Sequence, residues 1–334
     1  MEGRMEPVRV ASVGLGWWGG VLADAARAAG LELVSCFSPS DRRLKFAEEH
    51  GCRAAASFEE VLEDPEVDAI MLATPHSMHG EHTVRAAEAG KHVFVEKPFT
   101  LDVADAKRAI AATEKADVVL QVGHNRRRQP ANRRLKELVD TGALGVIHHV
   151  EANLSHPKGL NPRTGWRADR AESPGGGMTG LGVHMVDNLI YLVGRPARLA
   201  AFSKQIAAVG TLDEETSILL EFESGPVGFV ATTTVIPDVA KTVAFGTRAA
   251  AWNESDGERF YRQDVGEKER HEEPVETLDT IRDELVEFAE CVRTGKTPEV
   301  GGAEALEVVA VLEAVMESAE TGRMIDLDEV RSRR

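Results

Sequence analysis

Five residues near the start of the chain have types and spacing that suit phosphate binding. They are Gly14, Gly16, Trp17, Trp18 and Gly19, in the order GLGWWG. The apolar run 8–16 leads into them, and an Ala-rich segment, 18–29, follows. In such a strand–turn–helix unit the first glycine permits a tight turn, the second lets a pyrophosphate approach the backbone, and the third packs helix on strand. The helix N-terminus adds free N–H groups, so the pattern predicts dinucleotide binding.

The end of the next apolar run bears on the choice of cofactor. Dinucleotide-binding folds place an acidic residue there, which hydrogen-bonds the ribose 2′-hydroxyl. This chain has Ser38, followed by Arg42 and Arg43. A serine and two arginines favour the 2′-phosphate of NADP. In the alternative interpretation both arginines lie on the solvated face of the next helix, which Asp41 caps. We expect NADP rather than NAD, with use of both still open.

A second candidate for chemistry is the segment Glu96-Lys97-Pro98. It directly follows the apolar run 92–95, which reads as a short buried strand. Proline cannot donate to a sheet ladder, so the strand must end here. The ammonium of Lys97 either points into water or is directed into the cleft at the carboxyl edge of a sheet, where open α/β proteins bind ligands.

The elements that must position these residues alternate between strand and helix over the first third of the chain. We expect strands at 8–16, 31–37, 67–75, 92–95 and 118–125, and helices at 18–29, 41–51, 78–89 and 102–115. Strands spaced by helices of this length indicate βαβ units, and unbroken apolar strands indicate a parallel sheet covered on both faces. The pattern therefore predicts a doubly wound, Rossmann-type domain over residues 1–125.

After this domain the pattern changes to strands with little helix between them. We expect helices at 130–141, from about 177, at 279–294 and at 302–321, and strands at 146–154, 198–206, 216–223, 227–235 and 241–251, with a polar loop at 155–173. Such runs of strands predict a second α+β domain, residues 126–334, with a largely antiparallel sheet. Strand 216–223 alternates, with Ile218, Leu220 and Phe222 on one face, so a partner subunit could cover the other face.

Composition restricts the class of protein. The 334 residues include 39 Lys and Arg against 55 Asp and Glu, a net charge of −16, which disfavours nucleic acid and anionic membranes as partners. No apolar run approaches the ~20 residues of a membrane span. Three scattered cysteines and no secretory signal lead us to expect a cytoplasmic protein. No pair of histidines has zinc-binding spacing with carboxylates, so we expect no metal.

With these motifs in view, the chain resembles the glucose–fructose oxidoreductase, inositol dehydrogenase and MocA (Gfo/Idh/MocA) family. The likeness lies in GLGWWG, ATPHSMHGEHTVRAAEAGKHVFVEKPF, VGHNRRRQP and GGGMTGLGVHMVD, and covers nearly the whole chain. It implies an NAD(P)-dependent oxidoreductase that moves a hydride between nicotinamide and a hydroxyl or carbonyl of a sugar, polyol or related cyclic alcohol. The family's catalytic lysine corresponds to Lys97 and its histidine to His184, and relatives have a cis bond before the proline at Pro98.

The resemblance also suggests the surroundings of the two catalytic residues. Further cofactor contacts are expected from Thr74, Pro75, His76, His79, Glu96 and Asn125, with a helix cap as the alternative for His79. Further substrate contacts are expected from His124, Trp166, Arg167 and Asp187, of which Asp187 could orient His184. Many relatives have an aspartate four residues before the histidine, where this chain has Gly180. That departure leaves the identity of the substrate open.

Two other functions fit the same motifs. One is a regulator that binds NAD(P) without redox chemistry, and the other is an enzyme that cleaves a glycoside or eliminates a group from a sugar while tightly held NAD cycles without net change. Retention of both Lys97 and His184 argues against the regulator. The family's open sheet often forms an oligomer interface, so the resemblance also implies a homodimer or homotetramer.

Overall fold

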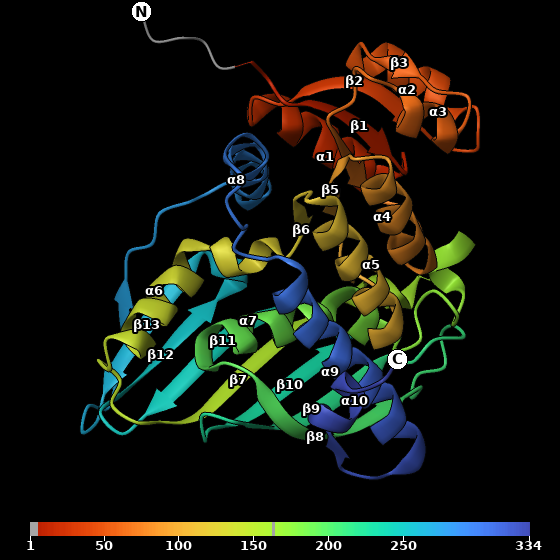
Figure 1. Cartoon of the computed structure of the whole chain (residues 1–334). Helices are drawn as coiled ribbons and strands as arrows, with labels where there is room; N and C mark the ends of the chain where they lie inside the picture. Colours follow the sequence, from red (N-terminus) through yellow and green to blue (C-terminus); the bar gives the residue numbers. More distant parts are fainter. Residues whose placement is uncertain (1–5, 162–163) are drawn as a thin grey trace, which may run out of the picture. The chain divides into compact units, whose positions relative to one another are not determined.

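The computed structural model describes residues 6–161 and 164–334, and the chain forms two compact units (Figure 1). The first unit comprises the chain up to Thr100, Ala104–Gly123 and Asp279–Leu306. The second comprises Leu101–Val103, His124–Leu278 and Glu307–Arg334.

The first unit contains a six-stranded parallel sheet in the order β3-β2-β1-β4-β5-β6. Its strands are β1 (Arg9–Val13), β2 (Glu32–Phe37), β3 (Arg53–Ala54), β4 (Ala69–Leu72), β5 (His92–Val95) and β6 (Leu120–Val122). This is the strand order of a dinucleotide-binding sheet, and its order reverses between β1 and β4. β4 is fully buried, as the apolar run predicts for a strand covered on both faces.

Helices connect these strands, and several begin or end with a clear local signal. They are α1 (Trp17–Ala28), α2 (Arg42–His50), α3 (Phe58–Glu63), α4 (His79–Glu88) and α5 (Val103–Ala116). The Ser57 hydroxyl caps α3 by accepting from the N–H of Glu60, 3.1 Å away. Gly51 ends α2 with φ of 69°, a left-handed conformation that favours glycine.

The helix α8 (Thr280–Thr294) belongs to the first unit, although it lies far along the chain. Its buried residues Leu285, Phe288 and Ala289 share a core with Val10 of β1 and Leu22 of α1. The sequence analysis places the whole segment after residue 125 in one second domain. The structure differs because the apolar face of α8 fills a gap beside the parallel sheet, a pairing that no local pattern encodes.

The second unit is built on a nine-stranded sheet in the order β14-β13-β12-β11-β7-β10-β9-β8-β15. The strands are β7 (Ile147–Ser155), β8 (Pro196–Lys204), β9 (Glu215–Phe222), β10 (Val227–Thr233), β11 (Val239–Gly246), β12 (Ala249–Glu254), β13 (Arg259–Asp264), β14 (His271–Glu273) and β15 (Ile325–Asp326). Among the residues that the structure describes, only the pair β7–β10 of this sheet is parallel, and the other seven pairs are antiparallel. The predicted open and largely antiparallel sheet is confirmed.

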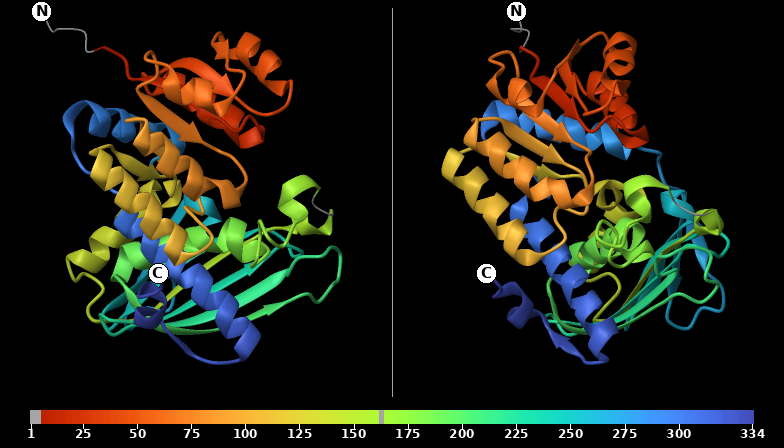
Figure 2. Two further views of the ribbon diagram at one scale, coloured as in Figure 1. Left: turned by 45° about the vertical axis from the view of Figure 1, so that its right-hand side comes forward. Right: turned by 90° about the vertical axis from the view of Figure 1, so that its right-hand side faces the viewer.

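Helices lie on one face of this second sheet. They include α6 (Pro130–Asp140), α7 (Val183–Val193) and the short α10 (Leu327–Arg331), while α9 (Gly302–Thr321) begins in the first unit and continues into the second. Figures 1 and 2 show α6 and α7 on the same side of the sheet. The opposite face carries no helix in the described part of the chain.

The structure differs from the sequence prediction in several places on this sheet. The predicted strand 241–251 is two strands, β11 and β12, joined by a turn at Thr247 and Arg248. The turn is polar and directly follows Gly246, so the apolar run is interrupted at this point. The short strands β13, β14 and β15 and the helix α10 were not expected, nor were β3 and α3 in the first unit. The helix expected from 177 begins with a π-helical turn, Met178–Gly182, before α7.

Candidate functional site

The glycine loop connects β1 to α1, and each of its three glycines has a distinct environment. Gly14 has φ of +96°, and a Cβ there would lie 2.4 Å from the carbonyl oxygen of Ala73. A Cβ on Gly19 would lie 2.1 Å from the carbonyl oxygen of Gly14. A Cβ on Gly16, the N-cap of α1, would meet nothing within 4 Å. The first and third glycines are therefore required by the fold itself, whereas the second borders open space.

The end of β2 lies beside this loop. Ser38 is buried, and its Oγ lies 3.3 Å from the carbonyl oxygen of Ser40, to which it donates. Arg42 is exposed and reaches back toward the carbonyl oxygen of Leu15, in the glycine loop, at 3.5 Å. Arg43 donates instead to the carbonyl oxygen of Ser40, at 3.0 Å, and lies 3.6 Å from Asp41. Of the two arginines, only Arg42 contacts the loop.

The segment after β5 combines a buried carboxyl with a half-buried lysine. Glu96 is 4% exposed, and its Oε2 accepts from the backbone N–H of Lys97 at 3.3 Å. Its Oε1 has no hydrogen-bond partner in the described part of the chain. Burial raises the pKa of the Glu96 carboxyl, and the charge of Lys97 and the indole of Trp18 act in the opposite direction. The Lys97–Pro98 peptide bond is cis, as the resemblance implied.

The residues that follow β4 lie at the same carboxyl edge of the parallel sheet as the glycine loop and the segment after β5. The Thr74 side chain is buried, and its Oγ1 has no partner among the described residues. Pro75 and His76 follow in a 3₁₀ turn, His76–Met78, and both are half-buried. His79 begins α4 and is only 1% exposed. Its two ring nitrogens face the carbonyl oxygens of Pro98 and Thr74, and the N-cap residue of α4 is Met78 rather than His79.

These residues fit a dinucleotide. The space in front of Gly16, beside the N-terminus of α1, suits a pyrophosphate. The buried Oγ1 of Thr74 and Oε1 of Glu96, which have no hydrogen-bond partner among the described residues, follow β4 and β5, the two strands next in order after β1, at the carboxyl edge where such ligands bind. The residues that would hold the cofactor are therefore Gly14, Gly16, Gly19, Ser38, Arg42, Thr74 and Lys97 with its neighbours.

In the second unit, two predicted substrate residues lie together. His184 is 7% exposed and stands in the first turn of α7, directly after the π-helical turn. Its ring meets that of His124 edge to face, with centroids 6.2 Å apart. Irregular π turns recur at functional sites. The two imidazoles come from segments 60 residues apart, a pairing that the sequence analysis did not predict.

Asp187 has a different partner from the one the sequence suggested. It is 1% exposed and forms an ion pair with Arg127, whose Nε donates to Oδ2 at 3.0 Å. The Arg127 guanidinium also stacks over the ring of Tyr191, 5.2 Å from its centroid. This buried pair joins α7 to the segment after His124, so Asp187 positions the helix that carries His184.

The remaining predicted residues of this unit are more exposed. Trp166 and Arg167 lie in a 3₁₀ turn, Gly165–Ala168, where the guanidinium stacks on the indole at 4.1 Å. Asn125 begins another 3₁₀ turn and is half-buried. A Cβ on Gly180 would meet nothing within 4 Å. By contrast, a Cβ on Gly176, which has φ of +54°, would lie 2.1 Å from the carbonyl oxygen of Asp213.

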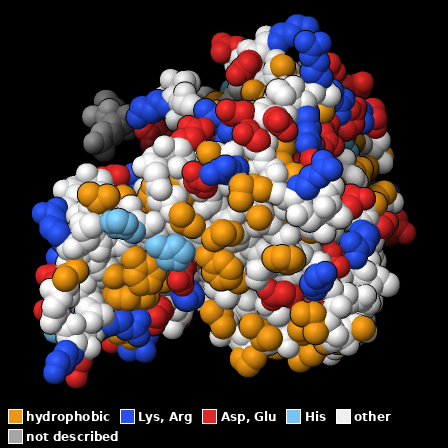
Figure 3. All heavy atoms as spheres, turned by 90° about the horizontal axis from the view of Figure 1, so that it is seen from below, with side chains coloured by type: hydrophobic (Ala, Val, Ile, Leu, Met, Phe, Trp, Pro, Cys, Tyr) orange, Lys and Arg blue, Asp and Glu red, His pale blue; other side chains and the backbone are white. Residues whose placement is uncertain are grey.

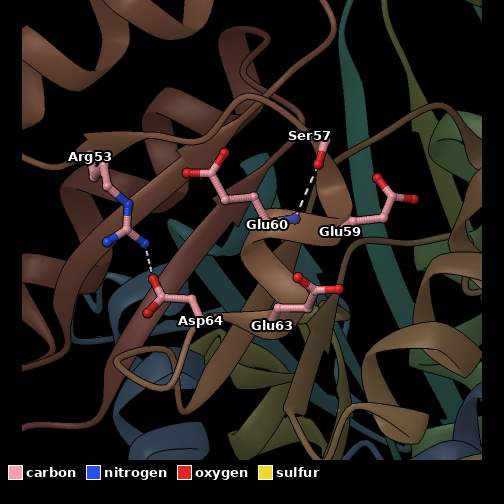
Figure 4. Close-up of a pocket in the computed structure, with 6 residues that line it drawn as sticks. All are labelled: Arg53, Ser57, Glu59, Glu60, Glu63 and Asp64. Atoms are coloured by element: carbon pink, nitrogen blue, oxygen red, sulfur yellow. Dashed lines mark hydrogen bonds and ion pairs between the residues drawn. The ribbon is translucent and has the colours of Figure 1, made fainter.

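A surface hollow beside α3 contains none of the predicted residues (Figure 4). It is lined by Arg53, Ser57, Glu59, Glu60, Glu63 and Asp64. Three of these serve the local fold: Arg53 pairs with Asp64, and Ser57 caps α3. Among the described residues we find no group of three or more His, Cys, Asp or Glu that could bind a metal, and no helix long and apolar enough to cross a membrane.

Comparison with known proteins identifies the family. The sequence model of an oxidoreductase family with an NAD-binding Rossmann fold, Gfo/Idh/MocA, matches residues 8–124, and the model of its C-terminal domain matches residues 132–251. The chain is 30% identical to 1,5-anhydro-D-fructose reductase of Ensifer adhaerens, over 91% of this chain and 93% of that protein. It is also 30% identical to scyllo-inositol 2-dehydrogenase (NAD(+)) of Bacillus subtilis, over 82% and 81%.

A solved structure agrees with these relatives. Aldose-aldose oxidoreductase from Caulobacter crescentus, complexed with glycerol, superposes with a TM-score of 0.87 at 26% identity, and covers 96% of this chain and 100% of that chain. The chain belongs to the Gfo/Idh/MocA oxidoreductase family. The predictions of the family, the fold class and a nicotinamide-dependent oxidoreductase are confirmed, while the roles of individual site residues stay predictions.

The sequence analysis missed one connection within the first unit. It treated His79 as a cofactor neighbour or a helix cap, whereas the structure shows it bonded to the backbone after two different strands. The available signal was a histidine placed just after one strand end, in a fold where neighbouring strands end at the same edge. A single sequence does not say which carbonyl groups such a ring will reach.

Proposed function

We propose that this protein reversibly oxidises a secondary hydroxyl of a sugar, polyol or related cyclic alcohol, with Lys97 as the residue that handles the hydroxyl proton. The observation that carries the proposal is the place of Lys97. It follows β5, two strands from β1 and its glycine loop, at the edge where all parallel strands end. A nicotinamide cofactor supplies the hydride acceptor or donor when it is bound.

The protein's own groups then have separate tasks. The Nζ of Lys97 hydrogen-bonds the reacting oxygen, takes the hydroxyl proton during oxidation and returns it during reduction. His184 hydrogen-bonds the substrate and shares its proton. His124, edge to face with His184, limits how far that ring can rotate. Trp166 and Arg167 offer an aromatic face and a guanidinium to a hydroxylated ring.

The relatives support the substrate class. They are named for an anhydro-sugar, an inositol and an aldose, all of which are polyhydroxylated and uncharged. The absence of the family's usual aspartate, at Gly180, favours a substrate different from that of the inositol enzymes.

A substrate panel tests this function. The purified protein is incubated with sugars, inositols, anhydro-sugars and their keto forms, with NADP and NAD in turn, while absorbance of the reduced nicotinamide is followed. We expect net formation or consumption of reduced cofactor with at least one compound. Product without net change in cofactor would indicate the cycling glycoside-cleavage mechanism. Binding of cofactor with no product from any compound would support the regulator.

We further propose that NADP binds more tightly than NAD. The end of β2 has Ser38 where an acidic side chain would repel a 2′-phosphate, and Arg42 stands over the glycine loop. One arginine–phosphate contact is worth roughly 1.5–3 kcal/mol, or about ten- to a hundredfold in affinity. Arg43 contributes less, because it is bonded to Ser40 and lies close to Asp41.

Calorimetric titration of both oxidised cofactors tests this preference. We expect Arg42→Ala to weaken NADP binding at least tenfold and to leave NAD binding unchanged. Arg43→Ala is the matched control and should have a smaller effect. Equal affinities of the native protein for the two cofactors would show that Arg42 points to solvent and that the backbone sets the choice.

A further inference from the structure

His79 makes two short contacts inside the first unit that connect the ends of two neighbouring strands. Its Nδ1 lies 2.8 Å from the carbonyl oxygen of Pro98, and its Nε2 lies 3.0 Å from the carbonyl oxygen of Thr74. Thr74 follows β4, and Pro98 follows β5. The histidine itself begins α4, so three elements meet at one ring.

Both partners of the ring are acceptors only. A backbone carbonyl accepts and never donates, so each contact is a hydrogen bond only when the facing ring nitrogen carries a proton. A neutral imidazole donates to one of the two carbonyls at a time, and an imidazolium donates to both. In either state the ring links Pro98 or Thr74, or both, to the start of α4.

Burial decides what this ring can do. His79 is 1% exposed, so the side chain cannot reach a cofactor or a substrate directly. Its effect on the segment that carries Lys97 passes through the Pro98 carbonyl, one of the two backbone groups that its ring faces. One of them, Pro98, immediately follows Lys97 across the cis peptide bond. The other, Thr74, precedes the turn that leads into α4.

We infer that His79 is a positioning residue that fixes Lys97 by holding the Pro98 carbonyl, through a proton on Nδ1, against the start of α4. This inference rests on the proposed role of Lys97 as the proton-handling group. A displacement of about 1 Å at a reacting group can cost roughly a hundredfold in rate. We therefore expect loss of the Pro98 contact to lower kcat far more than it changes KM.

The two contacts can be separated by two conservative substitutions. The amide nitrogen of asparagine takes the place of Nδ1, which faces Pro98, whereas the amide nitrogen of glutamine takes the place of Nε2, which faces Thr74. In His79→Asn we expect kcat within about threefold of the native value. In His79→Gln we expect kcat to fall ten- to a hundredfold, with KM for the alcohol little changed.

His82 provides the matched control, because it lies in the same helix, three residues later, and is also buried. Its ring packs at a tilt against the ring of Phe58, with 4.5 Å between the centroids, and no hydrogen bond joins it to the carbonyl of Thr74 or Pro98. We expect His82→Asn and His82→Gln to lower the melting temperature by amounts similar to the His79 variants. Neither should change kcat more than about twofold, so loss of stability alone would not reproduce the His79→Gln result.

A second readout does not depend on the substrate. Lys97 is half-buried, and its acetylation by acetic anhydride can be measured by peptide mass spectrometry relative to Lys45, which is 79% exposed. We expect Lys97 to react at least threefold faster in His79→Gln than in the native protein. His79→Asn and both His82 variants should match the native rate.

These readouts separate failure of the inference from failure of the proposed function. If the native protein turns over no compound, the proposed function fails and the acetylation rates alone decide the inference. Equal acetylation of Lys97 in the native protein and in His79→Gln would overturn the positioning role. A kcat that falls equally in His79→Asn and His79→Gln, together with equal losses of melting temperature, would also overturn it.

Discussion

Glu96 places a carboxyl group where water does not reach it. Its Oε2 has one hydrogen bond from its own neighbour, and its Oε1 has none in the described part of the chain. A buried carboxylate with so few donors is costly, and burial raises the pKa of Glu96 for this reason. The Trp18 indole N–H, in the glycine loop, also has no hydrogen-bond partner among the described residues, although it acts to lower that pKa. The Glu96 carboxyl therefore interacts both with Trp18 of the glycine loop and with Lys97, its neighbour in the chain.

Substitution of this carboxyl by an amide tests its energetic cost. A raised folded-state pKa means that the native protein loses stability as pH rises from the ordinary value of glutamate through the raised one. Glu96→Gln has no such loss, so we expect its free energy of unfolding to exceed that of the native protein by about 1 kcal/mol at pH 8. The difference should shrink toward zero near pH 4. Denaturant unfolding at both values measures it, and a variant less stable at pH 8 would contradict this account.

Single residues were predictable from the sequence to the extent that they stand in a contiguous motif. Lys97 and the three glycines could be identified because neighbouring letters define their local structure. The pairing of Asp187 with Arg127 and of His184 with His124 could not, because each pair joins segments about 60 residues apart. A helical spacing of three residues suggested that Asp187 orients His184. The structure instead pairs this buried carboxylate with the Arg127 guanidinium, because a buried charge needs an opposite charge beside it.

At the scale of elements, the loop between β1 and α1 allows the fold and the cofactor to be tested separately. A Cβ on Gly19 would press against the carbonyl of Gly14, whereas a Cβ on Gly16 would enter open space. We expect Gly16→Ala to keep the native melting temperature and to weaken cofactor binding at least tenfold. Gly19→Ala should lower the melting temperature by several degrees, because a backbone contact must shift. Unchanged cofactor affinity in Gly16→Ala would show that the pyrophosphate does not lie there.

The helix α4 gives a prediction that depends on pH. Burial lowers the pKa of His82 to about 4, since its ring is enclosed beside Phe58. A folded-state pKa below that of the unfolded chain means that the native protein loses stability as pH falls from about 6.5 toward 4. The variant His82→Phe has no such loss. Its free energy of unfolding, minus that of the native protein, should therefore be about 1–2 kcal/mol larger at pH 4.5 than at pH 7. If the free energies of unfolding of the two proteins differed by the same amount at all pH values, the lowered pKa of His82 would be contradicted.

Elements were predicted well where the chain alternates strongly between strand and helix. The strand at 92–95 and the helices at 279–294 and 302–321 agree with β5, α8 and α9 to within one residue. The tight turn that divides β11 from β12 was missed, although Gly246 and the polar pair Thr247-Arg248 interrupt the apolar run there. The place of α8 in the first unit was missed because its apolar face could pack on either domain's core, and the local sequence does not indicate which of the two it joins.

At the scale of the whole molecule, the second sheet exposes hydrophobic side chains on the face without helices. Figure 3 shows hydrophobic groups gathered over much of the side seen from below. Leu219 of β9 and Phe229 of β10 are direct cross-strand partners and are 51% and 36% exposed, and Phe202 of β8 is 70% exposed. The predicted alternation holds, since Ile218 and Leu220 are buried toward the helices. We propose that a second copy of the chain covers this face.

Light scattering tests this assembly. We expect the native protein to have a mass of at least two 36.2 kDa chains. The double substitution Leu219→Glu and Phe229→Glu should shift it toward the monomer, because facing copies would bury like charges. Leu44→Glu, at an exposed position on the first unit, is the control and should keep the native mass. A native mass of one chain at all concentrations would contradict the proposal.

The central claim is that the protein transfers a hydride and that Lys97 handles the accompanying proton. The most direct measurement compares Lys97→Ala with the native protein on the best compound of the substrate panel. We predict that kcat falls by about a hundred- to ten-thousandfold while calorimetric affinity for the cofactor changes less than threefold. Lys45→Ala, at an exposed lysine of the same unit, should match the native protein in both quantities. Turnover by Lys97→Ala within a few-fold of the native rate would contradict the account.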